Sequence, residues 1–219
     1  VMRHVDAACY LAKEQGRNRV HVYDPGDETM ERRRGEMQWV SRINNALLES
    51  QFELFVQPAI PLQNPAAPRY VEVLLRFRDG KVLRSPAEFL PAAERYSLSP
   101  KIDSWVLTAL FERYAQTPEC FTPDMLFAVN LSALSLCDED FLGFIDAALT
   151  RSTMPPELLC FEITETAAIG NLSRAVQFFN AMRARGCRFA LDDFGSGLSS
   201  FGYLRTLPVD FLKIDGLFV

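Results

Sequence analysis

The chain has 219 residues, of which 48% are hydrophobic and 23% are charged, a composition that supports a folded domain with a sizeable core. Its net charge of -5 argues against binding to long nucleic acid, because that affinity comes mainly from basic side chains. The five cysteines form no C-x-x-C pair, so we expect buried thiols in a reducing, cytoplasmic compartment. No apolar run approaches the roughly 20 residues of a membrane span, so we expect no direct membrane contact from this segment, which leaves open an anchor elsewhere in a longer parent protein.

The first part of the chain has a pattern of its own. Apolar residues recur at helical spacing up to Gly16, and residues 19–23 (RVHVY) alternate as a short strand does. Residues 24–35 are polar and contain a Pro-Gly pair and a basic run. They predict a linker that is helical in part, with its basic residues on a solvated helix face.

Helices and strands alternate from Glu36 onward. The spacing predicts helices at 36–50, 85–96, 101–115, 138–150, 173–186 and 198–207. Strands are predicted at 52–60, 69–77, 126–132, 158–164, 187–194 and 210–215. These strands are nearly continuous apolar runs, which is typical of parallel strands buried on both faces. The pattern predicts an α/β fold, either a barrel or a doubly wound sheet, and the lack of G-x-G-x-x-G after the first strand disfavours a dinucleotide-binding fold.

Polar side chains recur at or near the ends of successive predicted strands. They are Glu72, Asn130, Glu162, Asp192, Asp193 and Lys213. Each residue alone has a commoner structural explanation. A glutamate can be a solvated residue at the rim of the sheet, an asparagine can form a turn with its own backbone, and a lysine can extend its ammonium to the surface. Together they favour one shared site, because parallel barrels gather active-site residues at the strand ends and buried charges need partners or metal. Carboxylates with one amide suit Mg²⁺ or Mn²⁺, and the set is compatible with two ions that hydrolyse a phosphate ester.

Other chemistries fit the sequence less well. Both histidines, His4 and His21, precede the alternating region, which disfavours histidine-based catalysis there. The D-F-G at Asp193 has no accompanying Gly-rich loop or H-R-D motif, so we exclude a protein kinase. No G-x-S-x-G elbow is present for a serine hydrolase.

Seven segments, in order, resemble the EAL domain, a bacterial phosphodiesterase module for cyclic di-GMP. They are VQP, EVLLR, SPAEFLPAAE, VNLS, FEITE, ALDDFGSGLSS and LPVDFLKID. The resemblance covers residues 36–219 and implies a modified TIM (β/α)8 barrel with an antiparallel first strand. Residues 1–23 resemble the last helix and strand of a GGDEF domain, the diguanylate cyclase module often fused ahead of an EAL domain.

The resemblance also implies roles for individual residues. The metal ligands would be Glu72, Asn130, Glu162, Asp192 and Asp193, and the catalytic residues Lys213, Asp193 and Glu72, with Lys213 holding the nucleophilic water. Gln57, Leu75 and Arg76 would contact cyclic di-GMP, with the Arg76 guanidinium on a phosphate. The loop 194–200 would organise the second metal and communicate with a partner subunit. The product would be linear pGpG.

The sequence departs from the family in two ways. Val73 replaces the alanine of the family signature, and we expect no effect because it points away from the site. The last two βα units, with a later catalytic Glu and a QGY segment, are absent. We therefore expect a barrel incomplete at its C-terminus, from a longer protein, and an isolated fragment that is inactive.

Three interpretations stay open. The first is a metal-dependent cyclic di-GMP phosphodiesterase, favoured by the intact ligand positions. The second is a catalytically inactive EAL domain that acts as a cyclic di-GMP receptor, and the third is a structural partner domain. A homodimer is expected because dimers are common in this family.

Overall fold

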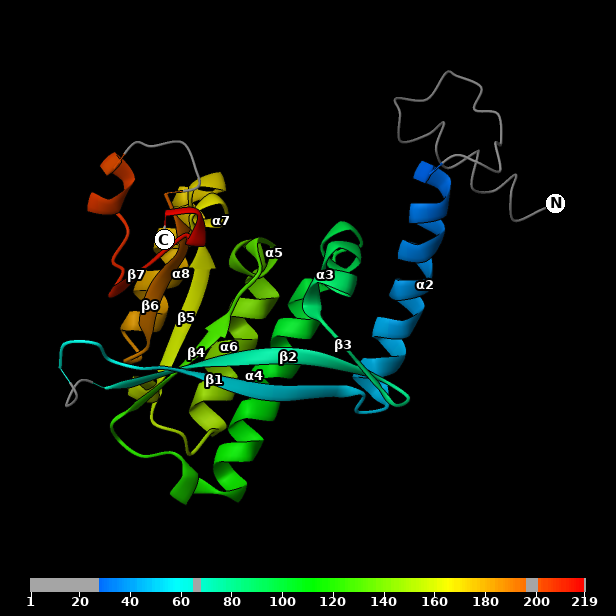
Figure 1. Ribbon diagram of the computed structural model, residues 1–219. Coiled ribbons are helices and arrows are strands. Elements are labelled where there is room, and N and C mark those ends of the chain that lie inside the picture. Colours follow the sequence, from blue (N-terminus) through cyan, green and yellow to red (C-terminus); the bar gives the residue numbers. More distant parts are fainter. Residues whose placement is uncertain (1–27, 65–67, 196–200, 219) are drawn as a thin grey trace.

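The computed structural model describes residues 28–64, 68–195 and 201–218. These residues form one mixed β-sheet with helices packed against it (Figure 1). The strand order is β1-β2-β4-β5-β6-β7, with β3 paired to β2. The bounds are β1 (Phe52–Ala59), β2 (Arg69–Asp79), β3 (Val82–Arg84), β4 (Met125–Asn130), β5 (Leu159–Thr164), β6 (Arg188–Phe194) and β7 (Phe211–Ile214). β1 runs antiparallel to β2, and β2, β4, β5, β6 and β7 are mutually parallel. The predicted α/β fold with a mainly parallel sheet is confirmed, and closure of the barrel stays a prediction.

One helix precedes the sheet and the others lie in the connections between its strands. The helices are α2 (Glu28–Leu48), α3 (Pro86–Arg95), α4 (Ser99–Gln116), α5 (Ala133–Cys137), α6 (Glu139–Arg151), α7 (Glu165–Gly170) and α8 (Leu172–Arg183). Short 3₁₀ turns complete them: η1 (Pro118–Cys120), η2 (Pro156–Leu158), η3 (Phe201–Arg205) and η4 (Gly216–Phe218). In the described ranges, no helix is both long enough and apolar enough to span a membrane.

Helix starts follow the capping signals of the sequence. At α3 the Glu88 carboxylate accepts a hydrogen bond from Ser85 N at 3.0 Å, which is half of a capping box. At α6 the Asp138 carboxylate accepts from Asp140 N at 2.9 Å and Phe141 N at 3.2 Å. These contacts satisfy amide groups that the first turn of a helix leaves without partners.

Several features differ from the sequence expectation: the short helices α5 and α7 were not predicted, and the described part of the helix predicted at 198–207 is the 3₁₀ turn η3. Helix α2 begins at Glu28 instead of Glu36, which agrees with the prediction that the linker 24–35 is helical in part. The short strand β3 was not predicted; it pairs with β2 through a turn at Gly80, whose φ of 61° suits glycine. The predicted GGDEF-like segment at 1–23 lies outside the described residues.

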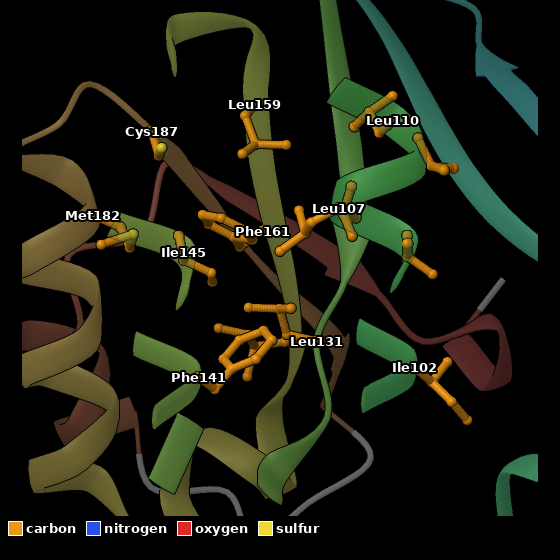
Figure 2. Close-up of a cluster of buried hydrophobic side chains, with 14 of the residues drawn as sticks. Ile102, Leu107, Leu110, Leu131, Phe141, Ile145, Leu159, Phe161, Met182 and Cys187 are labelled. Atoms are coloured by element: carbon orange, nitrogen blue, oxygen red, sulfur yellow. The ribbon is translucent and has the colours of Figure 1, made fainter. Parts of the chain in front are cut away.

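The main core fills the face of the sheet that the helices cover. Figure 2 shows Leu159 and Phe161 of β5 among side chains of α4, α6 and α8, including Leu107, Ile145 and Met182. Phe161 and Phe189 are fully buried, and the Phe189 ring stacks on Phe179 with centroids 4.1 Å apart. A fully buried aromatic side chain contributes about 2 to 3 kcal/mol by removing apolar surface from water.

The opposite face of the strands carries small side chains. A second, smaller cluster is formed by Leu126, Ala128, Cys160 and Ala190, with Tyr70 and Phe211 packed against it. Because side chains alternate along a strand, this is also the face of Glu72, Glu162 and Asp192. A cavity of about 620 Å³ opens there, with Gln57, Tyr70, Glu72, Arg188, Phe211 and Lys213 among its lining residues.

Candidate functional site

The Lys213 ammonium joins carboxylates from three other strands. Its Nζ donates to Glu162 Oε2 at 2.8 Å and Asp192 Oδ2 at 2.9 Å, and lies 3.5 Å from Glu72 Oε2. Burial opposes the charge on Lys213, but the hydrogen bonds to Glu162 and Asp192 outweigh burial and raise its pKa. The ammonium is therefore charged at neutral pH and holds four strands of the sheet together at this point.

Glu162 is the most buried member of the cluster, with 1% of the residue exposed. Its two carboxylate oxygens have different donors: the Tyr70 hydroxyl binds Oε1 at 2.6 Å, and Lys213 binds Oε2. Burial raises the pKa of Glu162, and the hydrogen bonds from Lys213 and Tyr70 act against that rise. A buried carboxylate is tolerated here because both of its oxygens have partners.

Asn130 lies at the end of β4, beside Glu162 in the sheet register. Its side-chain Nδ2 donates to Glu72 Oε1 at 3.0 Å, which ties the end of β4 to β2. The next residue along the chain, Leu131, donates its amide to the Glu162 carbonyl at 2.9 Å. With its nitrogen used on Glu72, Asn130 offers its amide oxygen as a ligand.

Asp192 and Asp193 occupy an irregular part of β6. The pairing between β6 and β7 shifts between Leu191 and Phe194, and Asp193 has a φ of 52°, unusual for a residue other than glycine. The Asp193 amide donates to Asp192 Oδ1 at 2.9 Å. Burial, followed by the charges of Asp192 and Asp215, raises the pKa of Asp193. Bulges and strained residues of this kind concentrate at functional sites.

Glu165 is a buried residue that the sequence analysis did not single out. Its carboxylate accepts from the Gly195 amide at 2.9 Å and from the Tyr203 hydroxyl. Glu165 thus contacts the chain on both sides of residues 196–200. Those residues, and with them most of the predicted metal-organising loop 194–200, lie outside the described residues.

The three predicted substrate contacts, on β1 and β2, lie on different faces of the sheet. Gln57 pairs with Glu72 across the β1–β2 register and lines the cavity. Arg76 is four residues after Glu72, on the same face, and its Nη1 donates to the Leu75 carbonyl at 2.7 Å. Leu75 packs against the main core on the other face, so the structure does not bring it to the cluster.

The donor set fits a hard divalent cation in its chemistry. Carboxylate and amide oxygens are the ligands that Mg²⁺ and Mn²⁺ prefer, and here they converge on a cationic atom. Among the described residues, no group of three or more His, Cys, Asp and Glu side chains is spaced to hold a metal. Lys213 lies between the carboxylates, so a metal ion would have to share these oxygens with the ammonium.

The EAL domain family model matches residues 40–219. This chain belongs to the EAL domain family. It is 39% identical over 221 residues to the cyclic di-GMP phosphodiesterase PdeB of Shewanella oneidensis, covering 100% of this chain and 26% of PdeB. It is 34% identical to the cyclic di-GMP phosphodiesterase PdeF of Escherichia coli, covering 82% of this chain and 24% of PdeF. The chain thus spans about a quarter of the length of these curated relatives.

Solved EAL structures have the same fold. The FimX EAL domain of Pseudomonas aeruginosa bound to c-di-GMP superposes with a TM-score of 0.74 at 34% identity, over 82% of this chain and 72% of that one. A MucR phosphodiesterase in complex with c-di-GMP gives a TM-score of 0.74 at 33% identity, over 81% of this chain and 72% of that one. The sequence-based resemblance of residues 36–219 to the EAL domain is confirmed.

Proposed function

We propose that this chain is the catalytic part of a metal-dependent phosphodiesterase that hydrolyses cyclic di-GMP to linear pGpG. One observation carries the proposal: acidic side chains from β2, β5 and β6 converge on a single cationic atom, Lys213 Nζ. The relatives named as cyclic di-GMP phosphodiesterases and the neighbouring structures with c-di-GMP bound support the choice of substrate.

Glu72, Asn130, Glu162, Asp192 and Asp193 would hold two divalent cations, Mg²⁺ or Mn²⁺. When bound, such ions neutralise the phosphodiester and lower the pKa of a bound water. Lys213 would orient this water, with its ammonium held by Glu162 and Asp192. Asp193, exposed at the bulge beside Asp192, would be the second group to orient the water.

The remaining contacts concern the substrate. Arg76 would bind a phosphate, because a guanidinium presents two parallel donors to a phosphate or carboxylate. Gln57, opposite Glu72 on β1, would contact the dinucleotide from the cavity. Alternation along β2 favours Leu74 over Leu75 as the apolar contact, because Leu74 shares the face of Glu72.

Several features of the whole protein belong to this proposal. They are a GGDEF-like piece at 1–23, a linker at 24–35, two further βα units that complete the barrel, a homodimer and a cytoplasmic site of action. The bifunctional diguanylate cyclase/cyclic di-GMP phosphodiesterase MucR supports the first of these, because its likeness at 33% identity covers 100% of this chain.

The test is hydrolysis by the full-length protein. Cyclic di-GMP is incubated with Mn²⁺ or Mg²⁺, and pGpG is followed by chromatography for the wild type and Glu72→Ala. We expect metal-dependent pGpG that Glu72→Ala abolishes. A matched control is Asp146→Ala, which removes an exposed carboxylate on α6 that pairs with Arg185. Wild-type rates from Glu72→Ala would contradict the site, and tight binding without product would make the protein a receptor.

A further inference from the structure

Tyr70 lies among apolar side chains on the inner face of the sheet. It precedes Glu72 by two residues on β2 and packs against the small cluster formed by Leu126, Ala128, Cys160 and Ala190. Its ring meets that of Phe211 edge to face, with centroids 5.5 Å apart. A phenylalanine would fit such surroundings, because a hydroxyl taken out of water is unfavourable unless it is hydrogen bonded.

The hydroxyl of Tyr70 has two partners, Glu162 Oε1 at 2.6 Å and Cys160 Sγ at 3.8 Å. A phenol has a single proton to donate, and a carboxylate can only accept. The Tyr70 proton therefore goes to Glu162 at 2.6 Å, and the contact with the Cys160 sulfur at 3.8 Å is the weaker of the two. The hydroxyl is thus directed at one oxygen of one carboxylate.

This contact decides which oxygen of Glu162 faces the cluster. With Oε1 bound to Tyr70, Oε2 points to Lys213, on the side where Glu72 and Asp192 also present oxygens. A carboxylate without the Tyr70 contact could rotate and exchange its two oxygens.

We propose that Tyr70 is a positioning residue, which orients the Glu162 carboxylate so that this glutamate can bind a divalent cation. The inference rests on the proposed function only in that a cation binds at Glu162. Groups that hydrogen bond to metal ligands fix their orientation, and their loss typically lowers metal affinity or activity about 10- to 100-fold. We expect an effect of that size from Tyr70.

The test removes one oxygen atom. Tyr70→Phe keeps the ring against Phe211 and deletes the hydroxyl. Tyr114→Phe on α4 is the matched control, because its ring contacts Phe121 away from the site. Calorimetric titration of the full-length protein with Mn²⁺ alone gives a dissociation constant for each variant, and urea unfolding gives the stability of each.

We expect Tyr70→Phe to raise the Mn²⁺ dissociation constant about 10- to 100-fold, with Tyr114→Phe unchanged. An unchanged constant for Tyr70→Phe, or a wild type that does not bind Mn²⁺, would overturn the inference. Cyclic di-GMP hydrolysis, measured alongside, separates the two proposals. If the wild type hydrolyses cyclic di-GMP and Tyr70→Phe has an unchanged Mn²⁺ dissociation constant, the proposed function stands and the proposed role of Tyr70 is wrong. If Tyr70→Phe binds Mn²⁺ more weakly but the wild type hydrolyses no cyclic di-GMP, the role of Tyr70 stands and the proposed function is wrong.

Discussion

Asp103 is a buried carboxylate whose titration should be visible in the stability of the protein. It lies on α4 with 8% of the residue exposed, and its Oδ2 accepts from Ser132 N at 3.0 Å and Ser135 Oγ at 2.6 Å. Burial raises the pKa of Asp103 from 3.8 to about 6, against the opposing effect of the hydrogen bonds from Ser135 and Ser132. The folded protein therefore binds a proton at Asp103 more tightly than the unfolded chain does.

The sign and the size of the effect follow from linkage. Because the folded pKa is the higher one, the contribution of this group to stability is greatest at low pH and is lost as pH rises through the folded pKa. A rise of about two units corresponds to about 3 kcal/mol. Asp103→Asn keeps an acceptor oxygen but does not titrate. The free energy of unfolding of Asp103→Asn minus that of the wild type should thus increase by about 3 kcal/mol between about pH 4 and pH 7.

Urea unfolding followed by circular dichroism at several pH values measures this difference, and the titration of all other groups cancels in it. Ser135→Ala removes a hydrogen-bond donor to the charged Asp103 carboxylate, which should raise the pKa of Asp103 further. The loss of stability with rising pH should therefore continue to higher pH in Ser135→Ala than in the wild type. A difference between Asp103→Asn and the wild type that stays constant from about pH 4 to pH 7 would refute the reasoning.

Two further predictions concern the cluster and the backbone. Lys213→Met removes the ammonium and leaves carboxylates facing one another, so we expect loss of turnover and a larger rise in melting temperature with Mn²⁺ than in the wild type; equal Mn²⁺ responses would contradict this. Gly186→Ala places a Cβ 2.9 Å from Glu157 Oε1 at a φ of 102°, and should lower the free energy of unfolding by roughly 1 to 3 kcal/mol. Gly143 lies in helix α6, and a Cβ added there would meet nothing within 4 Å. Gly143→Ala should therefore raise the free energy of unfolding by roughly 1 kcal/mol. Chemical denaturation measures both glycine variants, and equal changes in the free energy of unfolding would contradict the prediction.

Local signals in the sequence predicted the elements where pattern and caps agree. The apolar run at 158–164 became β5, and the Ser85–Glu88 pair begins α3. Helix α2 was placed too late because its first turns are polar, although Glu, Met and Arg favour helices. Strand β3 has three residues, too few for a period of two to be visible, and the only local signal for it is Gly80 in the two-residue turn Gly80–Lys81.

The site could be predicted only in part because it combines residues of different strands. The sequence gives the position of Glu72 on its own strand, and alternation from there selects Leu74 and Arg76 and disfavours Leu75. The contact of Tyr70 with Glu162 depends on how β2, β4 and β5 are placed side by side, which no local pattern encodes. The sequence thus indicates which residues share a face, and packing decides which of them touch.

The charge of the cluster implies that the proposed cations would serve the fold as well as the proposed reaction. When Glu72, Glu162, Asp192 and Asp193 are ionised, Lys213 balances one of four negative charges, and the site keeps an excess of three. Like charges held close together away from water oppose folding, so an ion bound only by the folded state adds stability. One divalent cation would still leave the site negative and repel a phosphodiester. Two would make these five side chains positive by a single charge, which one phosphodiester group would neutralise.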